Sequence, residues 1–152
     1  MKLVQLATAL VLAIAGFGTA QAQSNEDFLT IQLKDGPVVI QLMPDVAPKH
    51  VAQIKDLASK GEYDNVAFHR VIEAFMAQTG DPKGNGTGGS SLPNIPGEFS
   101  QTAEFRRGTV GMARSSDPNS ANSQFFICFT DAPWLNKQYS VWGQVIDGMD
   151  NV

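Results

Sequence analysis

The stretch from Phe68 to Ile72 places one cationic side chain among large apolar ones. If residues 66–72 form a strand, Phe68, Arg70 and Ile72 lie on the same face, because side chains alternate between the two faces along a strand. Arg70 would then present a permanently charged hydrogen-bond donor beside apolar surface. An exposed arginine in a salt bridge accounts for the same spacing, so periodicity alone leaves both interpretations open.

A second stretch combines one side-chain amide with aromatic residues. Gln124 directly precedes Phe125 and Phe126 in a run of strand-forming residues at 123–129. A sandwich strand with one polar position at its edge explains this run, and packing alone explains the phenylalanines. Packing does not explain why both stretches occur in one chain.

The glycine-rich run 84–89 formally matches the G-x-G-x-x-G pattern of dinucleotide-binding sites. That function needs a strand before the glycines, a helix after them and an acidic residue about 20 positions further on. Residues 90–96 contain two prolines and cannot open a helix. The run therefore predicts a flexible surface loop.

Metal binding and nucleophilic catalysis find little support in the residue types. His50 and His69 are the two histidines and Cys128 is the one cysteine, which is too few for a zinc site. Cys128 lies in an apolar run, which predicts a buried and inert thiol. As the one cysteine of the chain, it has no partner for an internal disulfide. No serine lies in a G-x-S-x-G nucleophile motif.

The charge balance argues against nucleic acid as a partner. The chain has 11 Lys and Arg against 15 Asp and Glu, with a formal net charge of −4. Its longest basic cluster is the pair Arg106 and Arg107. Binding to a phosphate backbone normally requires a basic patch or stripe.

Residues 1–22 have the organisation of an export signal. Lys2 supplies a positive start, residues 3–17 are largely apolar, and Ala20-Gln21-Ala22 matches the small-x-small pattern before a cleavage site. A retained membrane anchor needs about 20 apolar residues, and this run is shorter. We therefore predict cleavage without a stable anchor and one mature domain at residues 23–152.

The elements that must position these residues are mostly strands. Residues 28–33 and 38–42 flank turn residues and predict a hairpin, whereas residues 47–60 have the period of an amphipathic helix. Strand-like runs recur at 66–72, 75–79, 109–113, 123–129 and 139–145. Seven short strands with one clear helix favour a barrel or sandwich over a doubly wound sheet.

Several motifs together closely resemble those of the cyclophilins, in order and in spacing. They are Phe68-His69-Arg70, Phe75-Met76-Ala77-Gln78, the run 84–89, Met112-Ala113, Ser123-Gln124-Phe125-Phe126-Ile127 and Trp134-Leu135. The resemblance extends over residues 28–152 and implies a mainly β fold, an eight-stranded antiparallel barrel capped by helices. It also implies a peptidyl-prolyl cis-trans isomerase that needs no cofactor and acts on proline-containing peptides and folding proteins.

The resemblance assigns site residues position by position. It implies catalytic roles for Arg70, Phe75, Gln78 and Phe126. It implies substrate binding by Met76, Met112, Ala113, Arg114, Gln124, Trp134, Leu135 and Tyr139. In this scheme Arg70 donates to the prolyl nitrogen in the twisted state, an apolar pocket holds the proline ring, and Gln78 binds a substrate carbonyl.

Three positions distinguish this chain within the family. Tyr139 and Arg114 stand where the best-known eukaryotic members have histidine and asparagine, and both resemble bacterial periplasmic members. Together with the leader, they predict export across the inner membrane to the periplasm. The sequence contains nothing that calls for more than a monomer, so we expect a monomer. Trp134 stands where bacterial members often have phenylalanine, and it predicts binding of cyclosporin as an inhibitor.

The end of the sequence carries one further expectation. Residues 147–152 look like the beginning of a helix, and the family closes its barrel with a second helix and a last strand after this point. We therefore expect a C-terminally truncated form of a longer protein. A barrel that binds proline-containing chains without turning them over, and a structural barrel protein with no such binding, are the alternatives to an isomerase.

Overall fold

A computed structural model describes residues 28–152, and this part of the chain is mainly β. The predicted leader at residues 1–22 lies outside the described residues. The elements within 28–152 are β1 (Phe28–Leu33), β2 (Gly36–Leu42), α1 (Pro48–Ser59), β3 (Arg70–Ile72), β4 (Met76–Thr79), β5 (Thr109–Met112), β6 (Phe125–Cys128), η2 (Pro133–Leu135), β7 (Val141–Asp147) and η3 (Met149–Asn151). The hairpin, the helix and all seven predicted strands are therefore confirmed.

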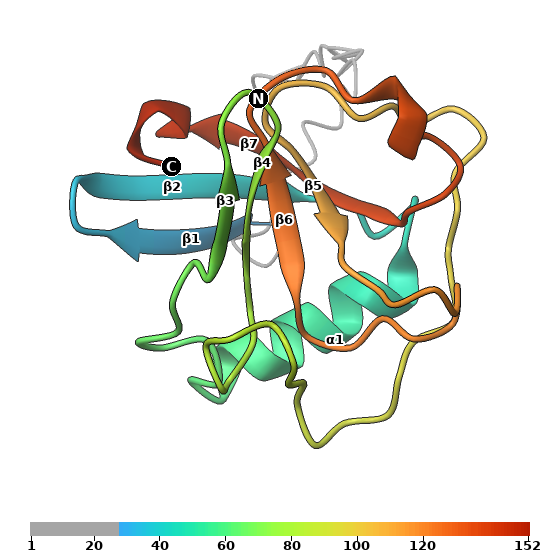
Figure 1. The fold of residues 1–152 in the computed structure, drawn as a ribbon, viewed down its shortest axis with the longest axis horizontal. Helices are drawn as coiled ribbons and strands as arrows, with labels where there is room; N and C mark the ends of the chain where they lie inside the picture. Colours follow the sequence, from blue (N-terminus) through green and yellow to red (C-terminus); the bar gives the residue numbers. More distant parts are fainter. Residues whose placement is uncertain (1–27) are drawn as a thin grey trace, which may run out of the picture.

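The seven strands form one curled antiparallel sheet in the order β1-β2-β7-β5-β6-β4-β3. Figure 1 shows α1 lying across one end of this sheet. In the described part of the chain, β1 and β3 are its edge strands. The mainly β, helix-capped architecture that the family resemblance implies is confirmed.

The third strand is shorter than predicted, because it begins at Arg70 and not at residue 66. Its partner β4 ends at Thr79, and Gly80 then turns the chain away with a φ of 88°. The hydroxyl of Thr79 donates to the carbonyl of Ala67 at 2.9 Å, where a strand would accept a backbone N–H. Residues 66–69 therefore have no neighbouring strand to continue the ladder.

The helix α1 is capped from a distant part of the chain. Pro48 occupies the first turn, where a missing N–H costs nothing, and Ala47 offers no side-chain cap. The carboxylate of Glu98 accepts the backbone N–H groups of Lys49 and His50 at 2.9 and 3.2 Å. Negative charge at a helix N-terminus is stabilising, so Glu98 fixes the loop that carries it onto α1.

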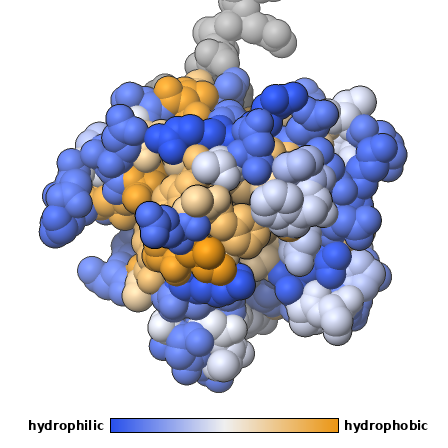
Figure 2. All heavy atoms as spheres, turned by 45° about the horizontal axis from the view of Figure 1, so that its top comes forward, coloured by the Kyte–Doolittle hydropathy of each residue, from blue (hydrophilic) through white to orange (hydrophobic). Residues whose placement is uncertain are grey.

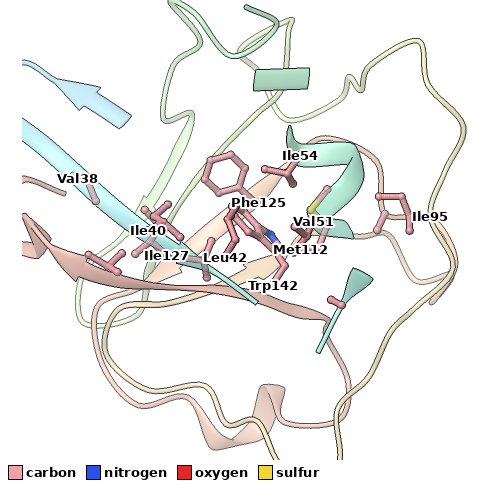
Figure 3. Close-up of a cluster of buried hydrophobic side chains, with 14 residues drawn as sticks. Val38, Ile40, Leu42, Val51, Ile54, Ile95, Met112, Phe125, Ile127 and Trp142 are labelled. Atoms are coloured by element: carbon pink, nitrogen blue, oxygen red, sulfur yellow. The ribbon is translucent and has the colours of Figure 1, made fainter. Parts of the chain in front are cut away.

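The main core lies between α1 and the sheet, as Figure 3 shows. Val51 and Ile54 of α1 pack with Phe125 of β6 and Trp142 of β7. The Phe125 and Trp142 rings meet edge to face, with their centroids 5.3 Å apart. A second buried cluster contains Met76, Phe105, Phe126, Cys128, Ala132, Leu135 and Val141. Among the residues that the structure describes, no helix is long and apolar enough to cross a membrane.

Candidate active site

A cavity of about 500 Å³ opens beside strands β3, β4 and β6. Its lining combines side chains from these strands, the glycine-rich loop and the segment around η2. The lining residues are His69, Arg70, Phe75, Met76, Gln78, Asn85, Gly86, Ala113, Arg114, Phe126, Leu135 and Tyr139. Nine of the twelve site residues implied by the sequence resemblance thus surround one cavity.

The face drawn in Figure 2 carries apolar side chains near its centre and hydrophilic ones around them. Apolar surface that a monomer leaves exposed is commonly a binding surface. The large apolar side chains exposed in the described chain are Val71, Ile72, Trp134 and Ile146.

Arg70 reaches the cavity from the first position of β3, where the sheet register places it opposite Gln78 of β4. Residues directly opposite each other in an antiparallel pair share a face and lie close enough for their side chains to interact. Nη1 of Arg70 donates to Oε1 of Gln78 at 3.3 Å. The guanidinium is therefore held by a neighbouring amide, and this is its one hydrogen bond within residues 28–152.

The apolar floor of the cavity is continuous with the second buried cluster. Met76, Phe126 and Leu135 are all buried, and each belongs to that cluster. The Phe126 ring stacks on Phe105 at a centroid distance of 5.6 Å and meets the Tyr139 ring edge to face at 5.8 Å. Rings packed on two sides are rigid, so the floor presents a fixed surface to a small apolar ring.

Two glutamine amides link the strands to the glycine-rich loop. Nε2 of Gln78 donates to Oε1 of Gln124 at 2.9 Å. Nε2 of Gln124 donates to the carbonyls of Gly86 and Gly88 at 3.1 and 2.7 Å. Gln124 lines a neighbouring hollow of about 320 Å³, which shares Gln78, Gly86, Ala113 and Arg114 with the cavity.

Arg114 forms part of the wall, and each nitrogen of its guanidinium donates one hydrogen bond. It lies 4.5 Å from the centroid of the Tyr139 ring, within the range of a cation–π contact. Nε and Nη2 both donate to the carbonyl of Gln138, at 3.0 and 2.8 Å, and Nη1 donates to that of Ser115 at 2.9 Å. These contacts keep a positive charge at the border between the two hollows.

Three residues implied by the resemblance do not line the cavity. Gln124 lines the neighbouring hollow, as described above. Trp134 is 62% exposed, and its ring lies 5.6 Å from that of Phe75 at the rim. The side chain of Met112 also lies away from the cavity, because it is 1% exposed and is packed into the main core. Side chains alternate along β5, so Met112 faces the core and the following Ala113 reaches the cavity.

Two lining residues were not among the predicted site residues, because their segment was interpreted as a surface loop and otherwise quoted only as a motif. Asn85 and Gly86 lie in the glycine-rich loop and contribute to the lining. His69 was quoted only as part of a motif, yet it also lines the cavity, beneath Gly86. The buried thiol of Cys128 is confirmed, and burial raises its pKa to about 12. Within residues 28–152, no group of three or more His, Cys, Asp or Glu could hold a metal ion.

Comparisons with known sequences and with solved structures point to the same family. Residues 28–152 match the family described as cyclophilin type peptidyl-prolyl cis-trans isomerase/CLD. A probable peptidyl-prolyl cis-trans isomerase of Brucella suis is 56% identical over 154 residues, covering 94% of this chain and 78% of the relative. A fungal isomerase of Rhizopus delemar is 46% identical over 127 residues, covering 80% of this chain and 20% of the relative.

Two solved structures share the fold. A cyclophilin from Hirschia baltica has a TM-score of 0.75 and 29% identity, covering 82% of this chain and 65% of the other. A cyclophilin type isomerase from Cryptosporidium parvum has a TM-score of 0.78 and 34% identity, covering 82% and 81% of the two chains. The latter was crystallised in the presence of the dipeptide Ala-Pro.

Proposed function

This chain belongs to the cyclophilin-type peptidyl-prolyl cis-trans isomerases, and from that premise we propose that Arg70 catalyses rotation of Xaa-Pro bonds in exported proteins that are folding. The isomerase activity is that of the family. The residue roles, the exported clients and the location are the proposal. The observation that carries it is a guanidinium beside a rigid apolar floor, with Gln78 holding one of its nitrogens.

The chemistry needs neither a new bond nor a proton transfer. Amide resonance gives the Xaa-Pro bond a rotation barrier of about 18–20 kcal/mol, and unaided exchange takes tens to hundreds of seconds. In the twisted state resonance is lost, and the prolyl nitrogen gains a lone pair that can accept a hydrogen bond. A donor placed at that nitrogen binds the twisted state more strongly than the planar one, which is the condition for catalysis.

Each part of the cavity has a role in this proposal. The proline ring rests on the floor of Met76, Phe126 and Leu135, with Phe75 at its edge. Arg70 donates to the prolyl nitrogen, and the side-chain amide of Gln78 binds the substrate carbonyl. An acceleration of about 10⁵ requires about 7 kcal/mol, which a charged donor and a fixed orientation above an apolar floor can supply.

The test is the cis-trans exchange rate of a short Xaa-Pro peptide with the wild-type protein and with Arg70→Ala. We expect the variant to lose most of the acceleration, by about a hundredfold or more, as for removal of a donor from a catalytic site. Arg106→Ala is the matched control, because this arginine is exposed and pairs with Glu104 and Asp131 outside the cavity. Peptide binding without any acceleration by the wild-type chain would identify a binding module instead.

The export proposal rests on the composition of residues 1–22 and has its own test. Mass spectrometry of the protein expressed in full should find a mature amino terminus at Gln23 and the product in the periplasmic fraction. An uncleaved chain that stays with the cytoplasmic fraction would overturn this part and leave the isomerase assignment intact.

A further inference from the structure

Asp81 is a fully buried carboxylate that the catalytic scheme above does not use. It follows Gly80 at the end of β4, and no ion pair of the described chain involves it. A buried charge without a cationic partner must be stabilised by hydrogen bonds. Its oxygens accept backbone N–H groups from Lys83, Asn85 and Gly86, at 2.9, 3.1 and 2.6 Å.

These donors keep the carboxylate ionised. Burial raises the pKa of Asp81, but hydrogen bonds from the backbone N–H groups lower it more and bring it to about 2. The N–H groups that lower this pKa are those of Lys83, Asn85 and Gly86 and, in addition, that of Gly88. A charged acceptor at the centre of the loop draws these N–H groups inward.

The inward N–H groups leave loop carbonyls free to face the strands. The carbonyls of Gly86 and Gly88 both accept from Nε2 of Gln124. Gly86 has a φ of 88°, a left-handed conformation that suits glycine. A Cβ added at Gly88 would collide with Oδ1 of Asp81, so the closeness of loop and carboxylate depends on that glycine.

Two carbonyls facing one amide decide which way that amide points. A primary amide can present either its oxygen or its NH₂ group, and two acceptors select the NH₂ group. Oε1 of Gln124 is thereby directed at Nε2 of Gln78, 2.9 Å away. Oε1 of Gln78 is directed in turn at the guanidinium of Arg70.

We propose that Asp81 is a positioning residue for the isomerisation, because it organises the loop whose carbonyls orient Gln124, Gln78 and finally Arg70. The inference rests on the proposed role of Arg70. Asp81 itself touches neither the cavity nor a substrate. Its effect is therefore expected on the step that needs Arg70 in place, more than on substrate binding.

The first test measures kcat and KM of Asp81→Asn for a proline peptide. The variant replaces one acceptor oxygen by an NH₂ group that repels the loop N–H donors. We expect kcat to fall about tenfold with KM within about twofold, less than the loss from deleting Arg70, because the guanidinium remains but is misplaced. Glu98→Gln is the matched control, a carboxylate that also accepts backbone N–H groups but contacts α1. It should lower the melting temperature and leave kcat unchanged.

A double-mutant cycle separates positioning from general loosening. Gln124→Leu cuts the connection between the loop and Gln78, so adding Asp81→Asn in that background should change kcat by less than about twofold. An undiminished tenfold loss in that background would overturn the proposal. Failure of the Arg70 assignment is distinguishable, because Arg70→Ala would then be active.

A second variant covers the case in which Asp81→Asn does not fold. Gly88→Ala keeps the carboxylate and pushes the loop away from it. It should reproduce the fall in kcat and shift the side-chain amide NMR signals of Gln78 and Gln124 while the β4 and β6 backbone signals stay in place. Unchanged kcat with shifted side-chain signals would refute the connection.

Discussion

The buried pair of His50 and Glu98 makes the stability of this protein depend on pH in a defined window. His50 is fully buried, and its Nδ1 lies 2.8 Å from a carboxylate oxygen of Glu98. Its Nε2 is buried and has no hydrogen-bond partner among residues 28–152. A proton on Nε2 would be an unpaired buried donor, so the neutral ring with Nδ1–H donating to Glu98 is favoured. Burial therefore lowers the pKa of His50 below 6.5, although the hydrogen bond and the charge of Glu98 oppose this.

The sign of the effect follows from comparing folded and unfolded chains. Below pH 6.5 the unfolded chain protonates His50 and the folded chain does not, so the free energy of unfolding falls as the pH falls. One proton contributes at most about 1.4 kcal/mol per pH unit. Between about pH 7.5 and 5.5 the loss therefore reaches at most about 1.4 kcal/mol, the limit for a ring that stays neutral in the folded state. The lowered pKa of Glu98 adds a further loss only below about pH 4.5.

The assay is urea unfolding of wild type and His50→Gln at about pH 7.5 and 5.5. The wild type should lose more free energy of unfolding between the two pH values than the variant does. The variant removes the titrating ring and keeps a side-chain NH₂ donor for Glu98. Equal losses in both proteins, or a wild type that gains stability at the lower pH, would refute the reasoning about the buried ring.

Three further outcomes are expected. Cys128 has a buried thiol with a pKa of about 12, so it should resist a thiol reagent at about pH 8 in the native protein and react at once in denaturant. Rapid labelling of the native protein would contradict the burial of the thiol. Cyclosporin binding is a prediction from the sequence, and a fluorescence titration of wild type and Trp134→Phe tests it. We expect the wild type to bind and the variant to bind about tenfold more weakly, since the ring at the rim loses its N–H and part of its surface; unchanged affinity would remove the role of Trp134. Gly111→Ala should lower the free energy of unfolding in urea by about 1–3 kcal/mol and raise KM. Its Cβ would lie 2.5 Å from Phe105 and 2.7 Å from Phe126, which would force the cavity floor to shift. Wild-type values for both quantities would show that the two rings move aside freely.

The fold was readable from the sequence wherever hydrophobic period and turn residues agree. The hairpin at residues 28–42 has alternating apolar positions around Lys34 and Asp35, and the helix at Pro48–Ser59 has proline at its start and glycine after its end. The first residue of β3 could not be predicted from the sequence, because it depends on where the partner strand β4 ends. That depends on a positive φ at Gly80, some ten residues further along.

The predicted site residues came from the resemblance alone, and the lining of the cavity differs from that prediction in two places for physical reasons. Met112 and Ala113 are both apolar, so composition cannot tell which faces the core and which the cavity. The loop that carries Gly86 was expected to be a simple surface segment. No helix follows this glycine-rich run, and no residue type within it indicates what holds the loop in place. Its anchor is Asp81, and an aspartate is normally exposed, so nothing in the residue types indicates a buried one.

The polar and apolar halves of the cavity differ in what holds them. Phe126 and Leu135 are part of a buried cluster, and disturbing them costs stability as well as activity. Arg70 lies on an edge strand of three residues, all of them exposed. The three cross-strand pairs of this strand fix its backbone but not the rotamer of the long arginine side chain. Its direction must come from side chains, and the chain of hydrogen bonds from Gln78 through Gln124 to the glycine-rich loop supplies it. Substitutions in that loop should therefore change catalysis at little cost in stability, whereas substitutions in the floor should change both together.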